Sequence, residues 1–154
     1  MPAIPPLPEL AVPDAYRTTV ESWQRFTGSL RLHGQGTEAA VQVERCAAGR
    51  LQGAYPAGAH DVEVRIESEV RGDVLTTLLR TLVGAVRAAD ARCRRIVYAV
   101  DEGGVEKIEA AEAAGFRYVV DVDVQDLELS LLVAEPSWVT ATDMDLDLAH
   151  VPGT

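Results

Sequence analysis

Hydrophobic and polar residues alternate with a period of two along several stretches of the chain, as expected for β-strands with one buried face. The alternation is most regular over residues 62–68, where Val62, Val64 and Ile66 share one face and charged residues occupy the other. Apolar, β-branched runs predict further strands over residues 7–10, 39–46, 50–55 and 95–100, and a hairpin formed by residues 116–124 and 127–133.

Apolar residues recur every three or four positions in three other stretches, which predicts helices. Residues 73–89 carry the longest apolar stripe, with Asp73 placed to cap the first turn. Residues 105–114 form a shorter, alanine-rich pattern that ends at Gly115, a residue type that commonly follows a helix. Residues 14–28 show a third pattern of near-helical spacing.

The order of these elements indicates a mixed α/β (α+β) fold. Antiparallel strands come first, and a strand–helix–strand–helix unit, which requires a parallel pair, follows them. We therefore expect a mixed, mostly antiparallel sheet flanked by helices. A proline-rich, extended arm over residues 1–13 precedes this domain, which spans residues 14–135, and a polar, acidic tail over residues 136–154 follows it.

The composition is that of a single globular domain with an acidic surface. The chain has 154 residues, of which 47% are hydrophobic, and its formal net charge is −10. Because binding to phosphate backbones requires a basic face, this charge argues against DNA or RNA as a partner. No apolar run approaches the roughly 20 residues that cross a membrane, and the N-terminus lacks a signal-peptide pattern. Two cysteines form neither a disulfide framework nor a metal-ligand pattern, so we expect a cytoplasmic protein without a membrane, nucleic-acid or metal partner.

Two motifs flank the expected helices. The first, Arg71-Gly72-Asp73-Val74-Leu75-Thr76-Thr77, joins residues 62–68 to the long helix, and the second, Ala110-Ala111-Glu112-Ala113-Ala114-Gly115-Phe116, ends the shorter helix. Their separation and the order of the elements resemble the acyl-CoA-dependent N-acyltransferases related to the GCN5 histone acetyltransferase (the GNAT superfamily). The resemblance covers roughly residues 61–133. It implies a GNAT-like fold with acetyl-CoA as co-substrate.

The resemblance also implies where acetyl-CoA lies, because the family splays apart the two strands that correspond to residues 62–68 and 95–100. The residues that would hold the coenzyme there are Ile66, Ser68, Arg71, Gly72, Asp73, Val74, Thr76, Thr77 and Gly104. Val74 and Thr76 replace small residues of the family's motif, and the Asp73 carboxylate repels a pyrophosphate. We therefore expect weakened coenzyme binding, with the hydroxyls of Thr76 and Thr77 as additional donors.

Three residues beside the expected opening are candidates for proton transfer. Glu63 and Glu67 lie on one face of residues 62–68, and either is a candidate for the base that deprotonates the amine. The alternative is that both belong to the charged outer face of a half-buried strand. Tyr98, on the neighbouring strand, is either the acid that protonates the leaving thiolate or a tyrosine packed in the core.

The resemblance implies an N-acetyltransferase in which a small-molecule or protein amine attacks the thioester directly, with both substrates bound. A catalytically silent binding or scaffolding domain of the same fold is the alternative, and an unrelated α+β interaction domain is a third interpretation. The N-terminal region is short of the family's usual two helices, so the acceptor cleft is either open or completed by a second subunit. A homodimer is therefore one expectation, with Trp138 of the tail as a contact residue.

Overall fold

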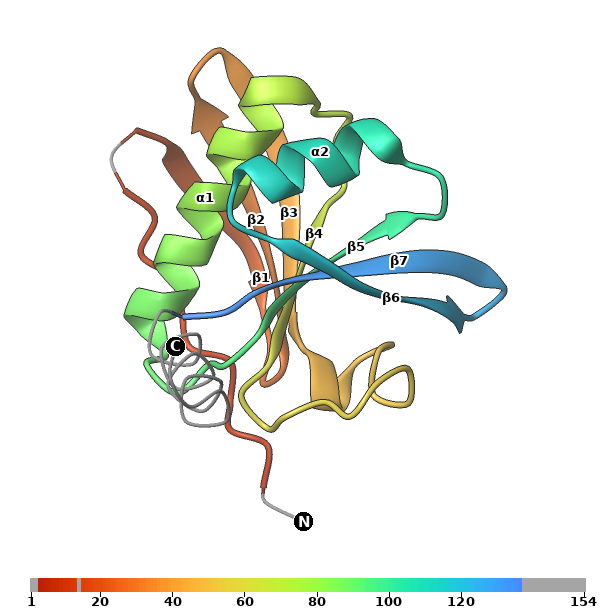
Figure 1. The fold of residues 1–154 in the computed structure, drawn as a ribbon. Helices are drawn as coiled ribbons and strands as arrows, with labels where there is room; N and C mark the ends of the chain where they lie inside the picture. Colours follow the sequence, from red (N-terminus) through yellow and green to blue (C-terminus); the bar gives the residue numbers. More distant parts are fainter. Residues whose placement is uncertain (1–2, 14, 137–154) are drawn as a thin grey trace, which may run out of the picture.

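The chain folds into one seven-stranded sheet with both helices on the same face (Figure 1). The computed structural model describes residues 3–13 and 15–136. The elements in chain order are β1 (Arg17–Trp23), β2 (Thr27–Gly34), β3 (Thr37–Arg45), η1 (Cys46–Ala48), β4 (Val62–Ile66), α1 (Gly72–Ala89), β5 (Ile96–Asp101), α2 (Val105–Ala113), β6 (Arg117–Val124) and β7 (Leu127–Ala134). The strand order is β1-β2-β3-β4-β5-β7-β6, and within the described residues β4–β5 is the one parallel pair. The expected mixed, mostly antiparallel sheet flanked by helices is confirmed.

Helix α1 buries the apolar stripe that the sequence predicts. Its buried side chains include Leu75, Leu78, Leu79, Leu82, Val83 and Val86. Each large apolar side chain removed from water contributes about 1.5–3 kcal/mol, so this stripe holds the helix on the sheet. The predicted cap is wrong, because Asp73 lies in the first turn and the N-cap residue Arg71 makes no side-chain hydrogen bond to the helix. The first N–H groups of α1 therefore lack a side-chain cap.

The end of α2 and the β6–β7 hairpin agree with the sequence prediction. Gly115 follows α2 with a φ of 100°, a conformation that suits glycine, and Phe116 is then buried. Strands β6 and β7 pair antiparallel, and the turn between them places Gln125 and Asp126 at φ values of 51° and 67°. Two successive positive φ values are typical of the tight hairpin turn that matches the twist of the strands.

The predicted helix over residues 14–28 is wrong, because residues 17–23 form the edge strand β1 and β2 begins at Thr27. The near-helical spacing of its apolar residues misleads, since an edge strand has little buried face to show alternation. Trp23 is paired with Gly28 across the hairpin, and a Cβ at Gly28 would lie 2.2 Å from the indole ring. The Trp23 Nε1 donates to the Leu7 carbonyl oxygen at 3.1 Å. Gly28 therefore makes room for the tryptophan.

Two predicted short strands are also wrong. Residues 7–10 have no regular secondary structure, although their two leucines are buried in the core. Residues 50–55 follow η1 as a series of turns. Leu51 of this segment is fully buried against the sheet face that carries no helix. Burial without strand pairing gives the same apolar pattern as a strand, which explains the error.

No helix in the described part of the chain is both long and apolar enough to span a membrane. The predicted acidic tail, with Trp138, lies outside the described residues from residue 137 onward.

Candidate functional site

The parallel strands β4 and β5 are joined only at their base. Val62 is paired with Ile96 and Glu63 with Val97, and no further pair follows toward the carboxyl ends of the two strands. Beyond this point β4 stays paired with β3 on its other side, and β5 with β7. The strands therefore part and leave a gap, called the opening below. The gap that the sequence led us to expect between these strands is confirmed.

Backbone groups of β4 face the opening. The Val62 N–H donates to the Arg95 carbonyl oxygen at 3.1 Å on the β5 side, whereas the Glu67 N–H donates to the Ala40 carbonyl oxygen at 2.8 Å on the β3 side. Because the direction of the N–H alternates along a strand, the backbone of Ile66 points to the same side as that of Val62. There β5 no longer pairs with it, so this backbone is available to a ligand.

A hollow of about 270 Å³ lies in the opening. Its walls come from the diverging ends of β4 and β5, from the β6–β7 hairpin and from two basic side chains of neighbouring segments. The lining residues are Arg50, Arg65, Ile66, Glu67, Tyr98, Ala99, Val100, Asp101, Lys107, Leu127 and Leu129. Carboxylates and cations therefore line the hollow together with a few apolar side chains.

Glu63 lies at the base of the opening and is only 1% exposed. Arg50 binds both of its carboxylate oxygens, with Nη2 donating to Oε2 at 2.6 Å and Nε lying 3.2 Å from each oxygen. Burial alone would lower the pKa of the Arg50 guanidinium, but Glu63 raises it above its ordinary value. The interpretation of Glu63 as part of a solvated outer face is wrong. Its lone pairs are engaged by Arg50, which leaves it poorly placed to accept a proton from an amine.

Glu67 is exposed and lines the hollow. The side-chain amide of Gln42, oriented to satisfy its neighbours, donates to Glu67 Oε1 at 3.0 Å. A general base must lie within reach of the proton that it removes, and Glu67 is accessible from the opening. Of the two glutamates, Glu67 is the one that is accessible from the opening.

Tyr98 is buried on β5, and its ring packs edge-on against Phe116 at a centroid distance of 6.1 Å. Burial, with a smaller effect from the charge of Glu69, raises the pKa of Tyr98 to about 12. The phenol therefore stays protonated near neutral pH, where it does not act as a phenolate base. The packed interpretation holds for the ring, while the residue also lines the hollow.

The loop after β4 enters α1 at the mouth of the opening. The Ser68 hydroxyl accepts a hydrogen bond from the Ala40 N–H at 2.9 Å, which ties the loop to β3. Gly72 adopts a φ of 63°, and a Cβ there would meet no atom within 4 Å. Arg71 forms an exposed ion pair with Glu69 at 2.9 Å. The loop thus presents a glycine and the uncapped first turn of α1 to the mouth of the opening.

Two further residues of the first motif differ in their surroundings. Thr76 is buried, and its hydroxyl donates to the Ala110 carbonyl oxygen of α2 at 2.8 Å. Its expected role as a hydroxyl donor to the coenzyme is therefore wrong, because the hydroxyl joins the two helices. Thr77, Asp73 and Val74 are exposed in the same turn, and their expected effect on the coenzyme stays a prediction.

Gly104 is the N-cap residue of α2 and lies beside a second hollow of about 350 Å³. A Cβ on Gly104 would come within 3.0 Å of the Asp101 carbonyl oxygen, so a larger residue would require the turn to shift. Asp101 and Lys107 line both this hollow and the one in the opening. The two hollows are therefore adjacent, and Gly104 lies at the edge of the candidate site.

Sequence reasoning missed most of the charged residues around the opening. Arg50 stood in a stretch predicted as a strand, and Arg65 was read only as part of an outer face. Asp101 and Lys107 carry no motif. The fold brings them together from four separate segments, and no spacing along the chain signals this.

Comparisons with known proteins identify the fold. No protein-family model and no curated protein matches the sequence. An uncharacterized protein (bh2621) from Bacillus halodurans matches with a TM-score of 0.64 and 15% identity, over 73% of this chain and 60% of that one. The aminoglycoside acetyltransferase AAC(6')-Ib, in complex with coenzyme A and kanamycin, matches with a TM-score of 0.62 and 16% identity, over 78% of this chain and 73% of that one.

Mycobacterium smegmatis RimJ, in complex with CoA-disulfide, matches with a TM-score of 0.52 and 13% identity, over 73% of this chain and 54% of that one. The chain thus spans less than two thirds of the length of the Bacillus halodurans protein and of RimJ. At such identities the likeness concerns the fold alone. Together with the parting of β4 and β5, it shows that this chain has the fold of the GCN5-related N-acetyltransferases.

Proposed function

We propose that this chain is an acetyl-CoA-dependent N-acetyltransferase in which an amine attacks the thioester directly while both substrates are bound. The observation that carries this proposal is the opening, where β4 and β5 separate after two residue pairs and leave strand backbone without a partner. The structures with the same fold that contain coenzyme A or CoA-disulfide support it. A gap of this kind in a sheet costs backbone hydrogen bonds, so a ligand that restores them is expected.

The residues at the opening fit an extended thioester with a pyrophosphate at one end. The backbone of Ile66 and the loop residue Ser68 would bind the pantetheine arm. The glycine at position 72 and the uncapped N–H groups of the first turn of α1 would bind the pyrophosphate. The bound donor supplies an activated carbonyl carbon and a thiol that leaves. Asp73 opposes the phosphates, which is worth only about 0.3–1 kcal/mol at an exposed helix terminus.

In this proposal Glu67 removes a proton from the incoming ammonium group, and Tyr98 supplies the proton that the leaving sulfur needs. Glu67 is accessible from the opening, whereas both oxygens of Glu63 are held by Arg50. The raised pKa of Tyr98 keeps its hydroxyl protonated at neutral pH, so a proton is present there. A positioned base of this kind typically contributes about 10²–10⁴-fold to the rate.

The alternative is a silent binding domain of the same fold, and two observations favour it. The Thr76 hydroxyl is engaged by Ala110, and the exposed Asp73 carboxylate occupies the turn where a phosphate would bind. Both features weaken the coenzyme site without closing the opening. Coenzyme affinity therefore decides between the two functions.

The test combines calorimetry with a thiol-release assay on the full chain. We expect acetyl-CoA to bind and the Glu67→Gln variant to lose about 10²-fold or more in kcat while its affinity for acetyl-CoA is unchanged. Glu9→Gln, an exposed change on the N-terminal segment, is the matched control and should leave kcat at the wild-type value. No heat of binding at millimolar acetyl-CoA would establish the silent alternative. Full activity of Glu67→Gln would remove this residue as the base.

A further inference from the structure

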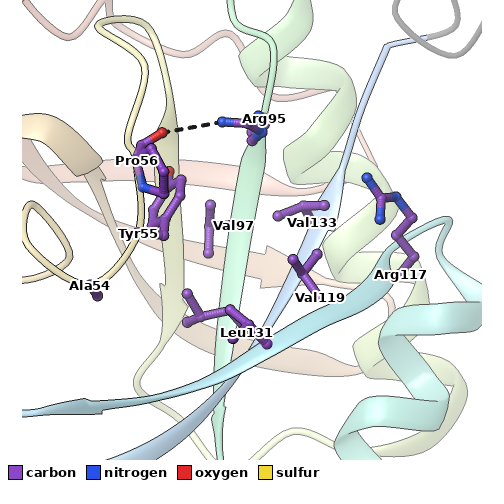
Figure 2. Close-up of a pocket in the computed structure, with 10 residues that line it drawn as sticks. Ala54, Tyr55, Pro56, Arg95, Val97, Arg117, Val119, Leu131 and Val133 are labelled. Carbon is purple, nitrogen blue, oxygen red and sulfur yellow. Dashed lines mark hydrogen bonds between the residues drawn. The ribbon is translucent and has the colours of Figure 1, made fainter. Parts of the chain in front are cut away.

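A separate pocket of about 330 Å³ opens on the sheet face that carries no helix. Figure 2 shows Val97 of β5 on its floor, with Tyr55 and Pro56 on one side and Val119 and Val133 on the other. The lining is mainly apolar, and the volume is at the lower end of the range for small-molecule sites. We call it the apolar pocket.

One wall of the apolar pocket is made by an irregularity in β6. Tyr118 is paired with Leu132, but the next pair joins Val120 to Leu131, so Val119 is an extra residue that bulges from the strand. As a result two consecutive valines line the pocket, and they remain 46% and 38% exposed. Bulges of this kind re-aim side chains and occur often beside functional sites.

Polar contacts fix the opposite wall. The Tyr55 hydroxyl donates to Asp61 Oδ2 at 2.9 Å, and the Arg95 Nη1 donates to the Pro56 carbonyl oxygen at 3.4 Å, as Figure 2 shows for the second contact. Asp61 is itself buried. The segment that covers the pocket is therefore held in place before any ligand arrives, so binding does not have to order it.

The apolar pocket and the opening are neighbours along the same face of the sheet. On β5, Val97 lines the pocket and Ala99 lines the opening, and on β7, Leu131 and Leu129 are divided in the same way. Residues two apart on a strand share a face and lie about 7 Å apart. A ligand of modest length can therefore place one end in the pocket and the other in the opening.

The charged side chains at the two hollows indicate which end of such a ligand lies in the pocket and which in the opening. Arg95 and Arg117 stand at the pocket. The opening carries the carboxylates of Glu67 and Asp101 beside three cations, but two of these cations are paired, Arg50 with Glu63 and Arg65 with Glu44, which leaves Lys107 as the third. Arg95 lies 3.6 Å from Asp61, and the Arg117 Nε donates to Glu135 at 3.0 Å, so both guanidinium groups are already paired. The pocket thus offers apolar contact without a free carboxylate, and an ammonium group is favoured at the opening.

We propose that the apolar pocket binds the hydrocarbon or aromatic body of the acceptor, so that the substrate class is a primary amine on a compact apolar body. This inference rests on the proposed acetyl transfer. The amine then reaches into the opening beside Glu67, and the apolar body fills the space under the bulge of β6. Polyamines lack such a body and would place a second ammonium group in a mainly apolar lining without a free carboxylate, so they are excluded.

The test measures binding and turnover separately with the full chain. Phenethylamine is titrated into the protein without acyl donor and followed by NMR, and thiol release from acetyl-CoA is then measured with phenethylamine and with putrescine. Val119→Trp fills the pocket from an exposed position. Val20→Trp, on an exposed β1 valine outside the pocket, is the matched control. Val119→Lys is the second pocket variant if the tryptophan variant does not fold.

We expect Val119→Trp to weaken phenethylamine binding and to raise its KM about tenfold or more, as the loss of roughly two buried methylene groups would. Val20→Trp should leave both values unchanged, and the KM for acetyl-CoA should be the same in all three proteins. Equal use of putrescine and phenethylamine, or equal effects of the two tryptophan variants, would overturn the pocket assignment while acetyl transfer stands. Binding of phenethylamine that Val119→Trp abolishes, without any thiol release, would support the pocket and refute acetyl transfer.

Discussion

The ion pair between Glu63 and Arg50 offers a sharp test of how the opening is held. Glu63→Gln removes the negative charge from a side chain that is 1% exposed, while the Arg50 side chain beside it is 14% exposed. The amide keeps the shape of the carboxylate but leaves the guanidinium without its counter-ion. The perturbation therefore isolates the charge from the packing.

The expected cost follows from this burial. Removing one partner of a buried pair costs about 3–5 kcal/mol, because the remaining charge stays desolvated. Arg50 is not fully enclosed and can turn toward water, so we expect about 3 kcal/mol. That is a large share of a stability that for domains of this kind is about 5–15 kcal/mol. Glu38→Gln, which breaks the exposed pair with Arg31, is the control and should cost under about 1 kcal/mol.

Urea unfolding of the three proteins measures these differences, provided that the m-value is unchanged. Replacing both partners with apolar residues, as in Arg50→Met with Glu63→Leu, should recover most of the loss, since the buried charge is then gone. If Glu63→Gln costs no more than Glu38→Gln, the pair does not hold the base of the opening. Arg50 would then bind the carboxylate of Glu63 less firmly than the distances indicate. Glu63 would again be a candidate for the catalytic base.

Two further predictions concern groups away from Glu63. Thr76→Val removes the hydroxyl that donates to the Ala110 carbonyl oxygen and should lower the free energy of unfolding by about 1–3 kcal/mol, with acetyl-CoA affinity unchanged in calorimetry; a large loss of affinity would instead restore Thr76 as a coenzyme ligand. Burial alone would raise the pKa of Asp90, but hydrogen bonds from His60 and Arg45 hold it below its usual value. Its stabilising effect is therefore present above the unfolded pKa of about 4 and is lost as the pH falls further. Asp90→Asn should be less stable than wild type at pH 7, and the difference in urea midpoints should shrink toward pH 3; a difference that stays constant with pH would contradict this reasoning.

Local patterns predicted the second half of the domain well. The stripe of α1 needs only its own spacing to show a buried face, and Gly115 marks the end of α2 by its conformation. The β6–β7 hairpin is likewise a local structure with a two-residue turn. In each case the physical cause lies within a few residues of the chain, so the sequence carries it in readable form.

The first half of the domain shows why other features were out of reach. Edge strand β1 has few buried positions, and its few large apolar residues happened to fall at helical spacing. Leu51 is buried by turns that lie on the sheet, not by a strand within it. The expected short strand over residues 50–55 failed for that reason. The spacing of apolar residues indicates which positions are buried. It indicates secondary structure only where the buried positions recur at regular intervals.

Some features of the candidate site could likewise be predicted from local sequence, and others could not. The sequence by itself determined that a strand, a glycine-bearing turn and a long helix follow one another, and that Glu63 and Tyr98 belong to the two strands concerned. Glu67 was also expected in the strand, but it follows β4, which ends at Ile66. Only the tertiary structure decided that Arg50 engages Glu63 and leaves Glu67 accessible, because a contact between residues 13 apart in the chain is fixed by how the turns after η1 lie on the sheet. The extent of the opening is likewise a property of two strands that each prefer their outer neighbour, and no single stretch of sequence encodes it.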